Sequence, residues 1–505
     1  MGARAIALEA GFSKKVLQFV TCEDDPVGIA LIKDPRVSTV VLTGATATAK
    51  LFMRIRPGLD LIAETGGKNA MIISALSDRD LAIKDLIQSA FGHAGQKCSA
   101  CSLAICEAEV YDDPNFREHL RDAAESLKVG SAWDLSTKVN PLIQAPNPTL
   151  FRGLTQLDDE ETWLLEPKQD PKNPGLWSPG IKLGVKPGSY SHQTEFFGPV
   201  LSVMRAENLK QAVELANGTP YGLTSGLQSL DDREQKYWMD NIESGNCYIN
   251  RGITGAIVQR QPFGGCKESC FGKGSKAGGP NYLMQLMTAE QKELPQLLEL
   301  PKEGILALGK HVDSKDKQIW DTSIGSYAFF WNHYFSKDQD PSLVQGQDNL
   351  LRYVPQKQMT LRISKIDHWV DVLRVVAATM TCRIKLEISS EMHLEALKGL
   401  LRVNVVAESE AAFIERLERE KIKRVRLLNK PSLELTKALA ENACNVVEGP
   451  VLANGRLELV HYLREVSFSI DYHRYGNLGI REKEGRAIVP AVATSCCGGG
   501  KCCRK

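Results

Sequence analysis

The sequence lacks an excess of charge of one sign and has no long run of apolar residues. Lysine and arginine number 62 against 61 aspartate and glutamate residues, so the formal net charge of the 505-residue chain is +1. Balanced charge provides no overall field that would attract nucleic acid or an anionic membrane. No apolar run approaches the length that spans a bilayer. We therefore expect neither a nucleic-acid partner nor a membrane partner.

Aromatic residues are scarce at 7%, whereas hydrophobic residues at 43% and charged residues at 24% are typical of a globular protein. No signal-peptide core follows Met1, so we expect a cytoplasmic protein. Of the 13 cysteines, nine are scattered from Cys22 to Cys444 and four lie in the last ten residues. Scattered cysteines in such a chain are typical of reduced thiols, most of them small buried hydrophobes.

An alternation of helical and extended patterns predicts an α/β fold with parallel strands. The first predicted helix has no strand before it, so the alternation of strands and helices begins with an incomplete unit. We therefore expect an N-terminal truncation. The predicted strands cover residues 16–20, 37–42, 383–388, 425–428, 445–447 and 466–470. The predicted helices cover residues 4–10, 25–32, 79–90, 369–379, 408–420 and 433–442.

Cys98 lies in a glycine-containing loop that follows the predicted helix 79–90, and Ser99 comes directly after it. A cysteine in a loop is most often an ordinary structural thiol, and only its neighbours can indicate a nucleophile. Glycine is concentrated in this loop and again in residues 261–280, which suggests backbone packed close to a ligand.

Two glutamates occur in segments suited to a binding site. Glu64 lies at a strand end and precedes Gly66 and Gly67, although a glutamate alone is more often a solvated surface residue. Glu195 and Phe197 are two residues apart, so in an extended segment their side chains point to the same face. There the carboxylate could hold a ribose hydroxyl and the aromatic ring could pack on a flat ring. A buried strand with a capped edge is the alternative.

These segments, taken in order with the string 262–269 (Pro-Phe-Gly-Gly-Cys-Lys-Glu-Ser), resemble the aldehyde dehydrogenase superfamily over about residues 5–290. Within it, the strings 95–100, 254–265 and 276–283 are similar to those of L-glutamate γ-semialdehyde dehydrogenases, also called 1-pyrroline-5-carboxylate dehydrogenases. The region from Asn349 to Leu478 is similar to the extra C-terminal domain of long proline utilization A proteins. The resemblance implies the C-terminal part of such a bifunctional protein.

The resemblance implies NAD as cofactor and L-glutamate γ-semialdehyde as the small-molecule substrate, oxidised to L-glutamate. It assigns Cys98 as the nucleophile that forms a thiohemiacetal and then a thioester, and Glu64 as the base that activates the hydrolytic water. It also implies a homo-oligomer and a proline dehydrogenase domain or partner. The implied cofactor-binding residues are Thr43, Gly44, Glu195 and Phe197, and the implied substrate-binding residues are Ser99, Ala277 and Gly278.

The resemblance also predicts the domain organisation. The fold class is α/β, an aldehyde dehydrogenase-like fold with an incomplete Rossmann-type cofactor domain and a second Rossmann-like domain at the C-terminus. The expected parts are a partial NAD-binding domain (1–65), a catalytic domain (66–290), a linker or wrap-around segment (291–345), the Rossmann-like domain (346–480) and a flexible cysteine-rich tail (481–505).

The chain departs from the family pattern at three points. Ala45 follows Gly44 where most members have serine, which removes a phosphate hydrogen bond of about 1 kcal/mol. Cys270 stands where glycine is usual after the serine. The oxyanion-hole asparagine and a ribose-binding lysine belong to segments upstream of the matched region. Loss of one oxyanion donor costs about a hundredfold or more in rate, so we expect the chain alone to be inactive or nearly so.

Two other functions compete with the dehydrogenase. The C-terminal domain has no glycine-rich phosphate loop, and the chain could be a non-catalytic assembly or lid fragment. The four tail cysteines, Cys496, Cys497, Cys502 and Cys503, could bind a soft metal. Adjacent cysteines match the usual separated zinc pairs poorly, however, so we expect no metal centre.

Overall fold

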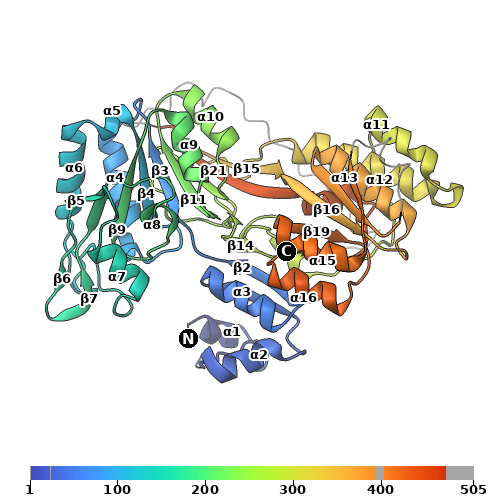
Figure 1. Ribbon diagram of the computed structural model, residues 1–505, viewed down its shortest axis with the longest axis horizontal. Coiled ribbons are helices and arrows are strands. Elements are labelled where there is room, and N and C mark those ends of the chain that lie inside the picture. The colour runs from blue at the N-terminus through green and yellow to red at the C-terminus, as the bar shows by residue number, and fades with distance from the viewer. Residues whose placement is uncertain (1, 23, 393–402, 474–505) are drawn as a thin grey trace.

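The largest layer of the structure is a nine-stranded sheet (Figure 1). The structure is a computed structural model and describes residues 2–22, 24–392 and 403–473. The sheet has the strand order β15-β21-β12-β11-β3-β4-β9-β8-β5, with antiparallel strands at both edges. Its strands are β3 (Asn69–Ile73), β4 (Cys101–Glu107), β5 (Thr162–Leu165), β8 (Gly180–Leu183), β9 (Val200–Ala206), β11 (Thr224–Gln228), β12 (Asn246–Ile249), β15 (Gln347–Pro355) and β21 (Leu463–Asp471).

Helices cover both faces of this sheet, which explains the continuous apolar runs of its central strands. In β3, Met71 and Ile73 pack into the core on the side of α4, whereas Ala70 and Ile72 pack into the core on the opposite side, with α9. The predicted helix 79–90 is confirmed as α4, which Asp78 caps at its N-terminus. The covering helices are α4 (Arg79–Phe91), α6 (Pro114–Glu125), α9 (Leu209–Asn217) and α10 (Asp232–Asn241).

A three-stranded sheet lies beside the N-terminal helices (Figure 1). Its strands are β1 (Thr39–Thr43), β2 (Asp60–Glu64) and β14 (Cys270–Phe271), and its helices are α1 (Gly2–Glu9), α2 (Ile29–Lys33) and α3 (Thr46–Ile55). The prediction of a buried strand over residues 16–20 is wrong, because these residues are exposed and outside any strand. Their local apolar pattern resembles a strand, but no described strand pairs with them.

The C-terminal region contains a five-stranded parallel sheet with the order β18-β17-β16-β19-β20. Because β16 is first in sequence, this is the 3-2-1-4-5 order of a Rossmann-like sheet. The strands are β16 (Gln358–Ile363), β17 (Lys385–Ser390), β18 (Asn404–Ala407), β19 (Arg424–Leu427) and β20 (Asn445–Val447). The helices are α13 (Trp369–Cys382), α15 (Glu410–Glu420) and α16 (Leu433–Glu441).

Two predicted domain boundaries need correction. The predicted strand 466–470 exists as β21, but it pairs with β12 of the nine-stranded sheet and not with the C-terminal sheet. The predicted linker 291–345 contains α12 (Lys317–Phe330), in which Trp320 and Tyr327 are fully buried. Since α12 packs against α13 in one core, this segment is part of the C-terminal layer. The predicted tail 481–505 lies outside the described residues.

Short elements complete the described parts of the chain. They are α5 (Ala108–Tyr111), α7 (Pro148–Thr155), α8 (Tyr190–Gln193), α11 (Glu303–Leu306), α17 (Gly455–Glu458), and the antiparallel pairs β6 (Gln169–Asp170) with β7 (Asn173–Trp177) and β10 (Tyr221–Gly222) with β13 (Cys266–Lys267). None of the helices in the described ranges is both long and apolar enough to cross a bilayer.

The placement of β21 can be tested by truncating Phe468, whose ring packs edge-on to Trp238 with ring centroids 6.4 Å apart. We expect Phe468→Ala to cost about 3–5 kcal/mol and to accelerate amide hydrogen exchange in β12. The matched control is Phe413→Ala, which removes a fully buried ring from the core between α15 and β19. It should accelerate exchange in β19 instead. Faster exchange in β19 but not in β12 for Phe468→Ala would contradict the strand order.

Candidate active site

The loop that carries Cys98 begins with three residues in the left-handed region. His93, Ala94 and Gly95, which follow α4 after Gly92, have φ values of 58°, 51° and 68°. A Cβ at Gly95 would lie 2.2 Å from the carbonyl oxygen of Gly198, so this close approach requires glycine. The loop is thereby packed against the segment that carries Glu195 and Phe197.

Asn69, at the start of β3, holds the backbone around Cys98. Its Nδ2 donates to the carbonyl oxygens of Cys98 at 2.7 Å and Ala100 at 2.9 Å, while its Oδ1 accepts from the backbone N–H of Thr224 at 3.0 Å. Sequence reasoning missed this residue, although it directly follows the Gly66-Gly67-Lys68 string. Asn69 is fully buried, and its side-chain amide both donates and accepts hydrogen bonds, so it fixes the position of the backbone around Cys98.

The Cys98 thiol is half-buried, and burial raises its pKa. The charge of Glu195 acts in the same direction, whereas the N–H of Ser99 and the Lys97 ammonium oppose it. The nucleophilic form of cysteine is the thiolate. In this environment the resting group is therefore the thiol, and it must lose a proton before it attacks a carbonyl carbon.

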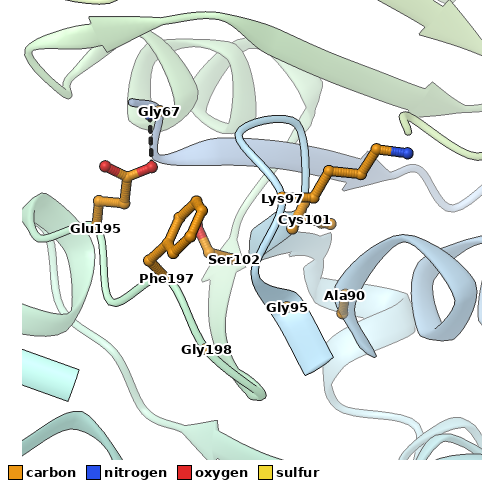
Figure 2. Close-up of a pocket in the computed structure, with 10 residues that line it drawn as sticks. Gly67, Ala90, Gly95, Lys97, Cys101, Ser102, Glu195, Phe197 and Gly198 are labelled. Carbon is orange, nitrogen blue, oxygen red and sulfur yellow. Dashed lines mark hydrogen bonds between the residues drawn. The ribbon is translucent and has the colours of Figure 1, made fainter. Parts of the chain in front are cut away.

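Glu195 is held at the edge of a pocket (Figure 2). Its Oε1 accepts from the backbone N–H of Gly67 at 2.9 Å. A Cβ at Gly66 would lie 1.9 Å from the other carboxylate oxygen, so the side chain occupies the space that glycine leaves open. Burial raises the pKa of Glu195, while the Gly67 N–H and the Lys68 ammonium oppose that shift.

Phe197 also lines the pocket, but not for the predicted reason. The residue has φ of 56°, so the segment is not extended there and the argument from alternating strand faces is wrong. Its ring is 40% exposed beside Glu195, whereas Phe196 is buried (Figure 2). The pocket is a shallow, open one, lined by Gly67, Ala90, Gly95, Lys97, Ala100, Cys101, Ser102, Glu195, Phe197 and Gly198.

Glu64 ends β2 and points toward the glycine turn at 264–265. Its Oε2 accepts from the N–H of Gly265 at 2.9 Å. Burial raises its pKa to about 7, against opposing effects of this N–H, of Lys276 and of Cys270. Among the residues that the structure describes, no hydrogen bond joins Glu64 to Cys98. The structure therefore places the loop that carries Cys98 beside Glu195 and Phe197, whereas the Glu64 carboxylate is held at the 264–265 turn.

Thr43 and Gly44 lie at the end of β1, directly before α3. The N–H of Gly44 donates to the carbonyl oxygen of Glu64 at 3.3 Å. The N-terminal N–H groups of α3 have no side-chain cap, because the capping position is Ala45. Uncapped N–H groups at a helix start favour anions, which agrees with the predicted phosphate contact.

The three predicted substrate residues are placed differently. Ser99 is 2% exposed beneath the Cys98 loop. Ala277 exchanges two hydrogen bonds of 2.8 Å with Phe263, so its N–H is not free to bind a substrate carboxylate, and that part of the prediction is wrong. Gly278 has φ of 76° and accepts from the N–H of Gln259 at 3.1 Å, and its own role is untested.

Tyr248 is a further residue near Cys98 that sequence reasoning missed. It is buried in β12, and its hydroxyl donates to the carbonyl oxygen of Gly255 at 3.2 Å. Burial raises the pKa of Tyr248 to about 12, and the nearby Cys98 adds to the shift. This contact links residues 254–258 to the surroundings of Cys98. No periodic pattern in the sequence indicates it.

No group of three or more acidic, histidine or cysteine side chains suited to a metal occurs among residues 2–22, 24–392 and 403–473. The four tail cysteines lie outside these ranges.

Comparison with known proteins agrees with this geometry. Residues 3–291 match the model of the aldehyde dehydrogenase family. The 1-pyrroline-5-carboxylate dehydrogenases of Geobacillus sp. strain WCH70 and of Bacillus subtilis are 35% and 34% identical over 291 residues, which is 56% of this chain and 56% of each relative. The chain thus spans about half the length of these curated relatives.

Two solved structures are also similar. Proline utilization A (PutA) from Corynebacterium freiburgense matches with a TM-score of 0.82 and 37% identity, over 94% of this chain and 46% of that one. The NAD-bound 1-pyrroline-5-carboxylate dehydrogenase from Thermus matches with a TM-score of 0.51 and 34% identity, over 56% and 55% of the two chains. By the family model, which covers more than half of its residues, the chain belongs to the aldehyde dehydrogenase family.

Proposed function

We propose that this site oxidises L-glutamate γ-semialdehyde to L-glutamate with NAD as the electron acceptor. The observation that carries the proposal is the packing of the Cys98 loop against Glu195 and Phe197 around one pocket. The relatives named 1-pyrroline-5-carboxylate dehydrogenase support the choice of substrate. A non-catalytic assembly or lid fragment is the alternative, which the first experiment below separates from the enzyme.

The chemistry divides into two steps at Cys98. The thiolate attacks the aldehyde carbon to form a thiohemiacetal, and two-electron oxidation of that carbon leaves a thioester. NAD, when bound, supplies the oxidant. Glu64 then takes a proton from water as the water attacks the thioester carbon, which releases L-glutamate and returns the thiol. Because the carboxylate of Glu64 is turned toward Gly265, it must swing toward Cys98 for this step.

The residues around the pocket fit the proposed cofactor. The buried carboxylate of Glu195 presents acceptor oxygens for ribose hydroxyls, and the space beside Gly66 is already shaped to it. The exposed ring of Phe197 offers a flat apolar surface for a nicotinamide. Thr43 and Gly44, before the uncapped start of α3, would border the phosphates. We choose NAD over NADP because the Thermus relative binds NAD.

We expect hydrogen-bond donors on the side of Cys98 away from the proposed cofactor pocket to bind the substrate carboxylate. Ser99 and the backbone of Gly278 remain our candidates, whereas the N–H of Ala277 is occupied by Phe263. We further propose that a proline dehydrogenase domain, in the same polypeptide or as a partner, delivers the semialdehyde, since 94% of this chain matches PutA.

Replacement of the nucleophile tests the function itself. In the chain co-expressed with the N-terminal half of a relative, we expect Cys98→Ala to lower NADH formation from L-glutamate γ-semialdehyde by about a thousandfold or more, because no thioester can form. Absorbance of NADH is the measurement, and Cys22→Ala, at an exposed thiol in the N-terminal region, is the control. If the parent chain forms no NADH even when it is co-expressed with the N-terminal half of a relative, the assembly or lid reading holds.

The space beside Gly66 provides a test of cofactor binding. In Gly66→Ala the added Cβ would displace the Glu195 carboxylate, and we expect NAD to bind about tenfold more weakly or worse. Gly92→Ala is the matched control, because a Cβ at Gly92 meets nothing within 4 Å. Titration calorimetry with NAD measures both variants. Equal affinity in Gly66→Ala and the parent chain would show that Glu195 does not hold the cofactor.

The raised pKa of Glu64 predicts how thioester hydrolysis depends on pH. Since the base works only when ionised and its pKa is about 7, the hydrolysis rate should rise about tenfold per pH unit below pH 7 and level off above it. Decay of enzyme acylated by p-nitrophenyl acetate isolates this step from the ionisation of Cys98. In Glu64→Gln the rise should disappear. If the hydrolysis rate of Glu64→Gln depended on pH in the same way as that of the parent chain, Glu64 would not be the base.

A further inference from the structure

Cys270 lies directly opposite the proposed base. In the antiparallel pair of β14 with β2, Cys270 is in register with Glu64 and Phe271 with Ala63. Cys270 is 8% exposed, and its thiol lies close enough to the Glu64 carboxylate to lower the pKa of that group. This is the residue that stands where the family usually has glycine, so the contact belongs to this chain and not to the family pattern.

Few other groups satisfy the Glu64 carboxylate. One oxygen accepts from the N–H of Gly265, and the other faces Gly264, where a Cβ would lie 2.8 Å away. The Lys276 ammonium is close enough to affect the carboxylate, but its hydrogen bonds go elsewhere. Its Nζ donates to the carbonyl oxygens of Gly245 and Gly264 and to Asn246 Oδ1, at 2.5–2.9 Å. Cys270 is thus the neutral side chain beside Glu64 that counteracts the effect of burial on its carboxylate.

The thiol is suited to act as a donor. Burial raises the pKa of Cys270 well above its usual value, and the adjacent Glu64 carboxylate acts in the same direction. The group therefore stays protonated at neutral pH and keeps its hydrogen. Lys276 opposes the shift, and Cys266 adds to it. A neutral donor favours the charged form of a carboxylate over the protonated form.

The C-terminal layer fixes the strand that carries this thiol. The N–H of Gly272, two residues after Cys270, donates to Asn445 Oδ1 of β20 at 2.9 Å. Ala443 packs in one apolar cluster with Phe271 and Ala63. The buried guanidinium of Arg424, in β19, is the cation that approaches the thiol from this side, and it donates to the carbonyl oxygen of His461. The position of Cys270 is therefore set by packing between layers.

We propose that Cys270 sets the resting position of the base Glu64, by donating a hydrogen bond that holds the carboxylate against the 264–265 turn and favours its ionised form until the carboxylate swings toward Cys98. The proposal rests on the proposed function, because it assigns a role to Glu64 in thioester hydrolysis. It gives the C-terminal layer a part in catalysis, since that layer holds β14 against β2. Cys270 is a positioning residue and does not touch the substrate.

Infrared difference spectroscopy of the full chain tests the contact without cofactor or substrate. A protonated carboxylic acid has its own C=O stretching band, and Glu64→Gln identifies the band that belongs to Glu64. We expect the midpoint of that band to lie near pH 7 in the parent chain and about half a unit to one unit higher in Cys270→Ala, because the donor is lost. Cys270→Ser, with a stronger hydroxyl donor, should keep the midpoint or lower it.

The matched control is Cys106→Ala, which removes an equally buried thiol from the nine-stranded sheet and should leave the midpoint unchanged. An unchanged midpoint in a folded Cys270→Ala variant overturns the proposal. If circular dichroism shows that this variant does not fold, Cys270→Ser decides, and a midpoint above that of the parent chain overturns it.

Hydrolysis of the acetylated enzyme then tests the role of the contact in catalysis. The pH profile of Cys270→Ala should move upward by the same amount as the infrared midpoint, with the rate above both midpoints retained to within about twofold. A profile that stays in place while the midpoint moves overturns the positioning role. Failure of the proposed function would instead appear as absent NADH formation with the infrared shift intact, so the two failures are distinguishable.

Discussion

The pairing of β21 with β12 is the constraint on which the rest of the structure depends. Residues 463–471 follow the whole C-terminal layer in sequence, yet they form the second strand from one edge of the nine-stranded sheet and run parallel to β12. Glu465 of this strand accepts from the backbone N–H of Lys276 at 2.8 Å, and the Ser467 hydroxyl donates to the carbonyl oxygen of Pro262 at 2.7 Å. The glycine-rich segment 261–280 is therefore anchored by a strand that lies two hundred residues away.

This anchoring explains how a segment with little regular structure can hold a buried base. Glu465 is 6% exposed, and burial raises its pKa, while the N–H of Lys276 is the first of the groups that oppose the shift. A buried carboxyl group is tolerated only when it is hydrogen-bonded. The same segment then turns at Gly264 and Gly265, where the absence of side chains lets the Glu64 carboxylate approach the backbone. The order of the site thus depends on hydrogen bonds from outside its own segment.

The sequence predicted local elements well and their partners less well. The helix before Cys98 and the strand Asn445–Val447 follow from local patterns, and both are present. The strand over 466–470 is also present, but it pairs with β12. An alternation of apolar residues predicts a strand and does not indicate which sheet the strand joins. Phe197 was assigned to the pocket on an assumption of extended backbone, whereas its ring reaches the pocket through a left-handed φ. The proposed role of Cys98 came from the family resemblance, whereas the proposed role of Glu195 was first suggested by its spacing from Phe197; helical or strand periodicity predicts neither role.

The protonation states of Glu64 and Cys98 explain how a carboxyl group and a thiol can both be buried in the proposed active site. The pKa of Glu64 is raised to about 7, and the pKa of Cys98 is raised above its ordinary value, so neither group carries a permanent charge at neutral pH. Burial makes each charge costly, and proton exchange with water removes the cost. A base with a pKa near the working pH can both accept a proton and release it. The apolar packing of β2 and β14 thus supplies the chemistry as well as the stability of the site, because burial sets the proton affinity of Glu64.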